Sequence, residues 1–141
     1  MTEIKNYNVH AARTKALIVD DSVSMRKLLR AMISNMGITQ IEEATDGQHA
    51  IQFIEKQPFD FILSDWKMEP MDGLELCRWV RAQKDPLISA IPFILVSAYY
   101  AEDLVKDANS AGVNLVMRKP IEPKMLRKEI ETIVLLKSKV A

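Results

Sequence analysis

Five short strand-like segments, each followed by a longer segment with helical periodicity, are the feature that most constrains this fold. We predict strands at 16–20, 40–44, 61–64, 92–96 and 114–117. The first of them is almost continuously apolar, which is typical of a strand covered on both faces. Right-handed crossovers return successive strands to one sheet, so this alternation predicts a parallel sheet with helices on both sides.

Apolar residues repeat at helical spacing after each predicted strand. The spacing predicts helices near 25–36, 47–57, 104–111 and 125–134, and one that begins around Asp72. Gly37 follows the helix at 25–36 and Gly112 follows the helix at 104–111, each as an expected C-terminal cap. Glu75 lies three residues after Asp72, the spacing of a capped helix start.

The length of 141 residues suits one domain with a sizeable core. Residues 1–14 are polar and lack periodicity, so we expect a flexible N-terminal extension before a domain at 15–138. Nineteen basic and nineteen acidic residues cancel, which gives no electrostatic argument for binding nucleic acid or an anionic membrane. The single cysteine and the absence of a long apolar stretch predict a cytoplasmic protein without membrane insertion.

Reactive side chains stand at or just beyond the ends of four predicted strands. They are Asp20 with Asp21, then Asp65, Ser97 and Lys119. The carboxyl ends of parallel strands share one edge of a sheet, where ligand crevices form. Three carboxylates there repel by roughly 3 kcal/mol per pair at about 5 Å and an effective dielectric constant near 20. Oxygen ligands suit Mg²⁺, and the ammonium suits a phosphoryl group.

Each of these groups also has an ordinary explanation. Asp20 and Asp21 could cap the first helix, and Asp65 could be a turn aspartate. Ser97 could be an ordinary strand-end hydroxyl, and Lys119 a lysine that extends its stem along apolar surface. Chemically compatible groups at four strand ends nevertheless favour a joint site, in which a carboxylate could act as nucleophile.

Taken together, these residues resemble the response-regulator receiver domains, most closely the single-domain chemotaxis type. The matching stretches are Leu-Ile-Val-Asp-Asp-Ser at 17–22, Asp-Trp at 65–66, Met-Asp-Gly-Leu-Glu-Leu at 71–76, Val-Ser-Ala at 96–98 and Lys-Pro at 119–120. The resemblance spans about residues 14 to 137. It implies a flavodoxin-like, doubly wound three-layer sandwich whose five parallel strands have the order 2-1-3-4-5.

The resemblance also implies a metal-dependent phosphoacceptor site. Asp65 would accept a phosphoryl group from a phosphohistidine. Asp21 and Asp65 would bind Mg²⁺ directly, together with the backbone carbonyl of Lys67, and Asp20 would act mainly through water.

Further positions would bind the phosphoryl group or report its presence. By resemblance, Ser97, Ala98, Lys67 and Lys119 are the catalytic or phosphate-binding residues, and we expect Lys67 to modulate dephosphorylation. Lys119 would precede a cis proline.

The expected switch residues are Ser97, Val116 and Tyr99. The family often has an aromatic residue three positions before the lysine, where this chain has Val116. Valine is too small and stiff to swing in the same way. Tyr99 or the neighbouring Tyr100 is therefore the candidate substitute.

The implied function is a phosphorylation-activated signalling switch of a two-component or chemotaxis pathway, rather than a conventional enzyme. Its partners would be a sensor histidine kinase or a histidine phosphotransfer protein, and a downstream target on the face formed by 104–111, 114–117 and 125–134. A monomer or weak dimer is expected. The alternatives are a phosphotransfer intermediate in a multistep relay, or a receiver domain cut from a larger DNA-binding or enzymatic regulator.

Two enzyme or ligand-binding classes fit the sequence less well. A phosphatase of the haloacid dehalogenase type needs a second aspartate two residues after its nucleophile, and Ser22 and Lys67 stand at those places. A nucleotide- or flavin-binding protein would need a glycine-rich phosphate loop after the first strand, where this chain has an acidic pair.

Overall fold

A computed structural model describes residues 11–135 of the chain. Five parallel strands form one sheet in the order β2-β1-β3-β4-β5, as predicted. The strands are β1 (Lys15–Val19), β2 (Gln40–Ala44), β3 (Phe61–Asp65), β4 (Phe93–Ser97) and β5 (Leu115–Arg118). The helices are α2 (Val23–Ser34), α3 (Gly47–Lys56), α4 (Gly73–Arg81), α5 (Pro86–Ser89), α6 (Glu102–Ala111) and α7 (Pro123–Ile130), followed by a π-helical turn η1 (Glu131–Leu135).

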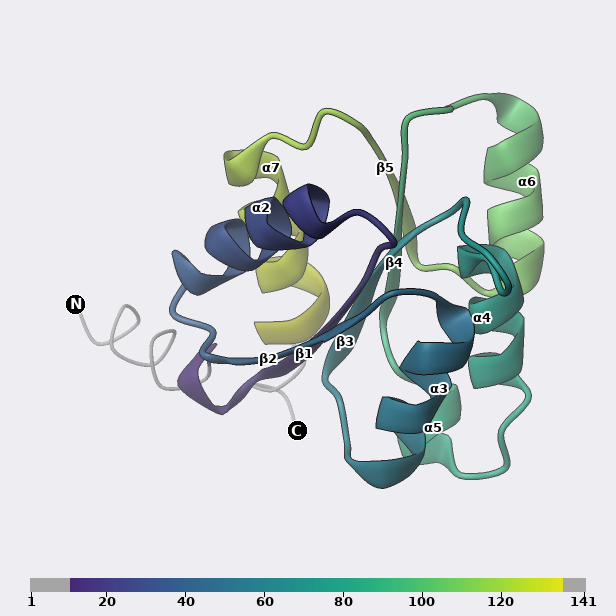
Figure 1. Cartoon of the computed structure of the whole chain (residues 1–141), viewed down its shortest axis with the longest axis horizontal. Coiled ribbons are helices and arrows are strands. Elements are labelled where there is room, and N and C mark those ends of the chain that lie inside the picture. Colours follow the sequence, from purple (N-terminus) through teal and green to yellow (C-terminus); the bar gives the residue numbers. More distant parts are fainter. Residues whose placement is uncertain (1–10, 136–141) are drawn as a thin grey trace.

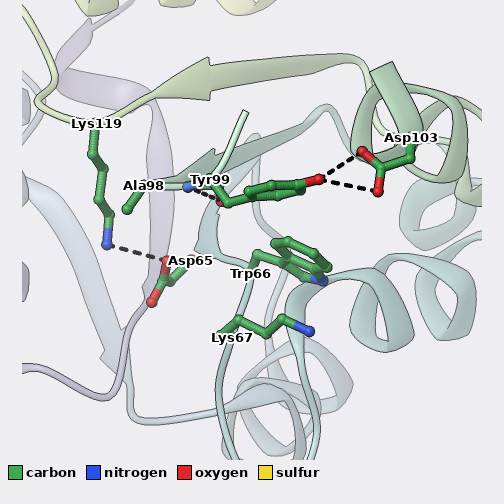
Figure 2. Close-up of a pocket in the computed structure, with 8 residues that line it drawn as sticks. Asp65, Trp66, Lys67, Ala98, Tyr99, Asp103 and Lys119 are labelled. Atoms are coloured by element: carbon green, nitrogen blue, oxygen red, sulfur yellow. Dashed lines mark hydrogen bonds and ion pairs between the residues drawn. The ribbon is translucent and has the colours of Figure 1, made fainter. Parts of the chain in front are cut away.

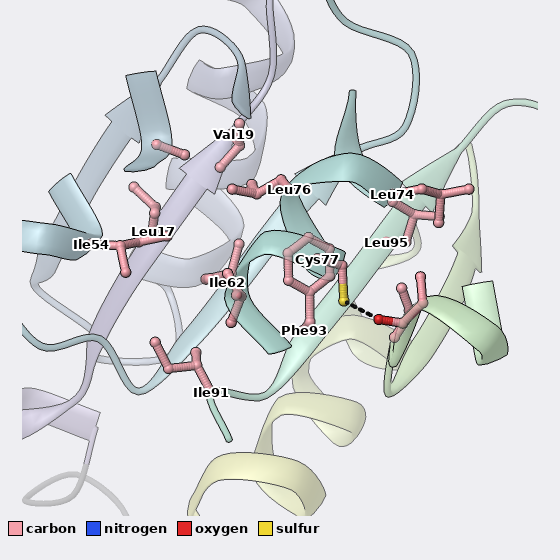
Figure 3. Close-up of a cluster of buried hydrophobic side chains, with 14 of the residues drawn as sticks. Leu17, Val19, Ile54, Ile62, Leu74, Leu76, Cys77, Ile91, Phe93 and Leu95 are labelled. Atoms are coloured by element: carbon pink, nitrogen blue, oxygen red, sulfur yellow. Dashed lines mark hydrogen bonds between the residues drawn. The ribbon is translucent and has the colours of Figure 1, made fainter. Parts of the chain in front are cut away.

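Helices cover both faces of the sheet, so the fold is a three-layer sandwich (Figure 1). Helices α3, α4 and α6 pack on one face and α2 and α7 on the other. The strands supply alternate residues to the two layers. On β3, for example, Ile62 joins the first core and Phe61 and Leu63 join the second. Figure 3 shows the first core, in which the α4 residues Leu76 and Cys77 lie over the β4 residue Phe93.

Local signals explain where several helices begin. Ser22 caps α2, because its side chain accepts a hydrogen bond from the backbone N–H of Met25. The alternative in which the acidic pair caps this helix is therefore wrong. Asp72 and Glu75 form a reciprocal capping box at the start of α4, which confirms the predicted helix start.

Two details of the helices differ from the prediction. The one-turn helix α5 was not expected, although Asp85 caps it and Pro86 occupies its first turn. The final helix changes to π-helical hydrogen bonding after Ile130, before its predicted end. Neither difference moves a strand end, so the edge that carries the reactive groups is unaffected.

The predicted N-terminal extension lies mostly outside the described residues. Of its last residues, Ala11 is buried against the α2 side of the core and Thr14 is also buried. The side chain of Gln40 donates a hydrogen bond to the carbonyl of Ala12. These contacts attach residues 11–14 to the β2 edge of the sheet.

Candidate functional site

The register of the parallel strands brings the reactive groups to one edge. Val19 pairs with Ser64, so Asp20, directly after β1, and Asp65, the last residue of β3, lie at neighbouring strand ends. Strand β4 lies on the other side of β3 and ends at Ser97. Ser97 pairs with Arg118, the residue before Lys119.

Three carboxylates gather at this edge. Asp20, Asp21 and Asp65 each offer an oxygen, and these oxygens all lie within 4.8 Å of one another. Mg²⁺ prefers oxygen ligands, so this acidic cluster fits a magnesium ion by its donor set. The three carboxylates among the predicted metal ligands are therefore brought together.

Asp20 is the buried member of this acidic cluster. Its Oδ1 accepts a hydrogen bond from the backbone N–H of Ser22 at 2.9 Å, whereas its buried Oδ2 has no hydrogen-bond partner among the described residues. Burial raises the pKa of Asp20, and the nearby charges of Asp65 and Asp21 raise it further; the Ser22 bond and the Lys119 ammonium oppose this shift. A buried carboxylate oxygen without a hydrogen-bond partner is a position that a bound cation would satisfy.

Lys119 supplies the positive charge. Its ammonium lies 3.1 Å from Asp65 Oδ1 (Figure 2). The same ammonium lies 3.8 Å from Asp20 Oδ2. The backbone N–H of Lys119 donates to the carbonyl of Ser97 at 2.8 Å, which fixes the start of the loop after β5. The peptide bond between Lys119 and Pro120 is cis, as the resemblance implied.

An open pocket of about 550 Å³ extends from Asp65 toward helix α6. Its lining combines predicted and unpredicted residues: Asp65, Trp66, Lys67, Ser97, Ala98, Tyr99, Asp103 and Lys119. Ser97 is buried, Ala98 and Lys67 are exposed, and the backbone N–H of Tyr99 donates to Ser97 Oγ at 3.1 Å. The site therefore has room for a phosphoryl group beside Asp65.

Val116 lies outside that pocket. It is partly buried and packs against the core on the α3, α4 and α6 side of the sheet. Of the three predicted switch residues, Ser97 and Tyr99 therefore line the pocket and Val116 does not.

Sequence reasoning missed two residues that contact the site. Arg26 donates from Nη1 to the carbonyl of Asp20 at 2.8 Å and pairs with Glu43, so it ties the loop after β1 to strand β2. Asp103 accepts hydrogen bonds from the Tyr99 hydroxyl. No local spacing rule predicts either contact, because Arg26 lies six residues after Asp20 and Tyr99 lies before the start of α6.

Comparison with known proteins agrees with this geometry. The family model for the response regulator receiver domain matches residues 16–131. The chemotaxis protein CheY of Pseudomonas aeruginosa is 37% identical over 119 residues, which cover 84% of this chain and 94% of that protein. Chemotaxis protein CheY-3 of Vibrio cholerae is 31% identical over 84% of this chain and 90% of its own length.

Solved structures have the same fold. Chemotaxis protein CheY4 of Vibrio cholerae superposes with a TM-score of 0.79 at 28% identity, covering 86% of this chain and 98% of that one. The receiver domain of a sensor histidine kinase from Pseudomonas aeruginosa, with a magnesium ion coordinated in its active site cleft, gives a TM-score of 0.76 at 25% identity. That match covers 85% of this chain and 96% of that domain. Among the described residues, no helix has the length and apolar character needed to cross a membrane.

Proposed function

Because this chain belongs to the response-regulator receiver family, we propose that Asp65 accepts a phosphoryl group from a phosphohistidine in a Mg²⁺-dependent reaction. The family is one of phosphorylation-activated signalling switches rather than conventional enzymes. The observation that carries the proposal is the convergence of three carboxylates with an ammonium 3.1 Å from Asp65.

The acidic cluster fits a magnesium ion. Asp21 and Asp65 would hold it directly with the backbone carbonyl of Lys67, and Asp20 would act mainly through water. When bound, the ion neutralises charge on the phosphoryl oxygens. The Oδ2 of Asp20, which lacks a hydrogen-bond partner in the described structure, and the oxygen-only donor set support this assignment.

The protein's own residues perform the transfer. A carboxylate oxygen of Asp65 attacks phosphorus, the bond from phosphorus to the imidazole nitrogen breaks, and the nitrogen keeps the electron pair. Lys119 holds the carboxylate and stabilises the negative charge on the transferred group. Ser97, Ala98 and Lys67 line the space that the phosphoryl group would enter.

The partners follow from this chemistry. The phosphoryl donor is a sensor histidine kinase or a histidine phosphotransfer protein, and the downstream target binds the face of α6, β5 and α7. The chemotaxis relatives support a role in a chemotaxis pathway. A cytoplasmic location and a monomer or weak dimer stay predictions. The division into an extension at 1–14 and a receiver domain at 15–138 stays a prediction.

Intact mass spectrometry tests the proposal. Incubation with acetyl phosphate and Mg²⁺ should add one phosphoryl group, about 80 Da, and the gain should disappear in Asp65→Asn. Asp107→Asn is the matched control, because Asp107 is an exposed aspartate on α6 outside the pocket. An unmodified wild-type protein, or an adduct that persists in Asp65→Asn, would contradict the assignment.

A further inference from the structure

Two aromatic rings and a lysine line the pocket on the side away from Lys119. The rings of Trp66 and Tyr99 have centroids 5.7 Å apart and are tilted by 34°. The ammonium of Lys67 lies 4.0 Å from the centroid of the Trp66 ring. In Figure 2 the Tyr99 and Trp66 rings lie one above the other, and Lys67 runs below Trp66. In the described part of the chain, Lys67 makes no ion pair with a carboxylate.

This aromatic pair is attached to helix α6. The Tyr99 hydroxyl donates to both carboxylate oxygens of Asp103, at 2.9 and 3.1 Å. That hydrogen bond is the main reason why the pKa of Tyr99 is raised. Asp103 is the second residue of α6, and the N-cap residue Ala101 makes no side-chain capping bond. Tyr99 is therefore a side-chain anchor for a helix start that has no side-chain cap.

The same tyrosine is attached to the phosphoacceptor site. Its backbone N–H donates to Ser97 Oγ, and its ring neighbour Trp66 directly follows Asp65. The adjacent Tyr100 has nearly the same exposed fraction, 49% against 48% for Tyr99. In the described structure, however, Tyr100 makes no hydrogen bond to Ser97 or Asp103 and no ring contact with Trp66. Exposure alone therefore does not distinguish the two tyrosines, whereas their contacts do.

We propose that the contacts Lys67–Trp66–Tyr99–Asp103 carry the phosphorylation signal from Asp65 to the start of α6, in place of an aromatic residue at position 116. This inference rests on the proposed function, because it needs a phosphoryl group on Asp65. Tyr99 acts as the coupling residue, and Tyr100 does not.

Charge drives the coupling. Phosphorylation replaces the single negative charge of the Asp65 carboxylate with the roughly −1.5 to −2 charge of a phosphoryl group, whose oxygens extend into a pocket that Lys67 and Asp103 also line. Bound Mg²⁺ offsets part of this charge, so the new acceptor oxygens and the remaining negative charge act on Lys67 and Asp103. Lysine has a flexible stem, and a charge-assisted hydrogen bond to phosphate is stronger than an exposed contact with a ring. Lys67 therefore leaves Trp66 for the phosphoryl group. Without Lys67, the contact between the Trp66 and Tyr99 rings loosens, and the negative charge of the phosphoryl group repels the Asp103 carboxylate. The hydrogen bond between Tyr99 and Asp103 therefore breaks. As a result, the first turn of α6 opens more often.

Hydrogen exchange measures this opening. The backbone N–H of Val105 is hydrogen-bonded to the carbonyl of Ala101, so its exchange reports the first turn of α6. In the wild type, saturating beryllofluoride with Mg²⁺, a mimic of the phosphoryl group, should speed this exchange roughly fivefold, the factor that one net hydrogen bond supplies. In Tyr99→Phe the exchange should already be fast without beryllofluoride and should change less than about twofold on its addition.

Tyr100→Phe is the matched control and should keep the full response. Lys67→Met should reduce the response while leaving the Val105 exchange slow in the unmodified protein, which separates the cationic step from the Asp103 anchor. A full response in Tyr99→Phe, or wild-type binding of beryllofluoride without any change at Val105, overturns the inference. A wild type that binds no beryllofluoride and gains no mass with acetyl phosphate overturns the proposed function, and this inference with it.

Discussion

The backbone at Gly73 lies close to the phosphoacceptor, and this approach supports a quantitative prediction. A Cβ atom at this position would lie 2.3 Å from the carbonyl oxygen of Asp65 and 2.7 Å from Leu95 Cδ1. Ordinary contact begins at 3.4 Å, so Gly73→Ala requires a shift of 1.1 Å (3.4 − 2.3) in the Asp65 backbone or in the start of α4. The Gly73 N–H also donates to the carbonyl of Trp66 at 2.8 Å, which opposes that shift.

The expected cost follows from two opposing effects. Overpacking of this kind costs about 1–3 kcal/mol. Replacing glycine by alanine returns about 0.4–1 kcal/mol, because it lowers the entropy of the unfolded chain. Gly73→Ala should therefore lower the free energy of unfolding by ~1–2 kcal/mol. A displacement of about 1 Å at a reacting group can cost ~100-fold in rate, so phosphorylation of Asp65 should suffer more than stability.

Gly47→Ala is the matched control. Gly47 also begins a helix directly after an aspartate N-cap, but its Cβ would meet the side chain of Met71, at 2.5 Å from Cγ, 2.8 Å from Sδ and 2.9 Å from Cβ. A rotamer change moves Cγ and Sδ but not Cβ, so Gly47→Ala should also cost about 1–3 kcal/mol of stability. The atoms nearest to the added Cβ at Gly47 all belong to Met71 and none to Asp65, so the phosphorylation rate of Gly47→Ala should stay within about threefold of wild type.

Urea unfolding and the rate of mass gain with acetyl phosphate measure the two quantities. The reasoning predicts that Gly73→Ala loses rate far beyond its loss of stability and that Gly47→Ala does not. Equal rates for Gly73→Ala and the wild type would refute it, as would equal rate losses in the two variants.

Three further predictions concern stability and reactivity. Burial raises the pKa of Asp20 in the folded protein above its unfolded value of about 4. The stability that the Asp20 carboxyl group contributes is therefore present below the unfolded pKa and is lost as the pH rises through the raised folded pKa. At pH 7 in EDTA, the urea midpoint of Asp20→Asn should therefore be higher than that of the wild type. Mg²⁺ should reduce this difference between the two midpoints, and a lower midpoint for Asp20→Asn in EDTA would contradict the prediction. Burial raises the pKa of Cys77 to about 11, so iodoacetamide at pH 8 should alkylate the native thiol far more slowly than the thiol in urea, and similar rates would disprove it. Asp72→Ala removes the capping box of α4 and should cost ~1 kcal/mol in urea unfolding, whereas Asp72→Asn should keep most of that stability.

The sheet could be predicted because its signals are local. Alternating strand-like and helical segments predict a doubly wound sheet, and the strand order came from the family resemblance. The second strand, Gln40–Ala44, has the predicted bounds. Helix α5 was missed because four residues are too few to show helical periodicity, although Asp85 and Pro86 are ordinary helix-start residues.

The site could be predicted only as far as strand ends determine it. Asp20, Asp65 and Lys119 meet because each follows a strand whose end is visible in the sequence. The contacts of Arg26 with the Asp20 carbonyl and of Tyr99 with Asp103 depend instead on loop paths and side-chain rotamers. No spacing rule predicts such contacts, and they distinguish this site from a generic acidic edge.

The contacts around Asp20 also explain why its buried carboxylate stays in place despite its cost in stability. An unsatisfied buried polar atom such as Asp20 Oδ2 costs about 1–3 kcal/mol, and more when it is charged. The Ser22 N–H and Arg26 hold the Asp20 backbone and Oδ1 in place, so the loop cannot relax to expose Oδ2 to water. A cation that binds the folded state removes this cost and stabilises the protein by mass action. We therefore expect lower stability without Mg²⁺ and affinity for Mg²⁺ to have one structural cause. Arg26→Ala, which would release the Asp20 loop, should reduce both the loss of stability in EDTA and the affinity for Mg²⁺.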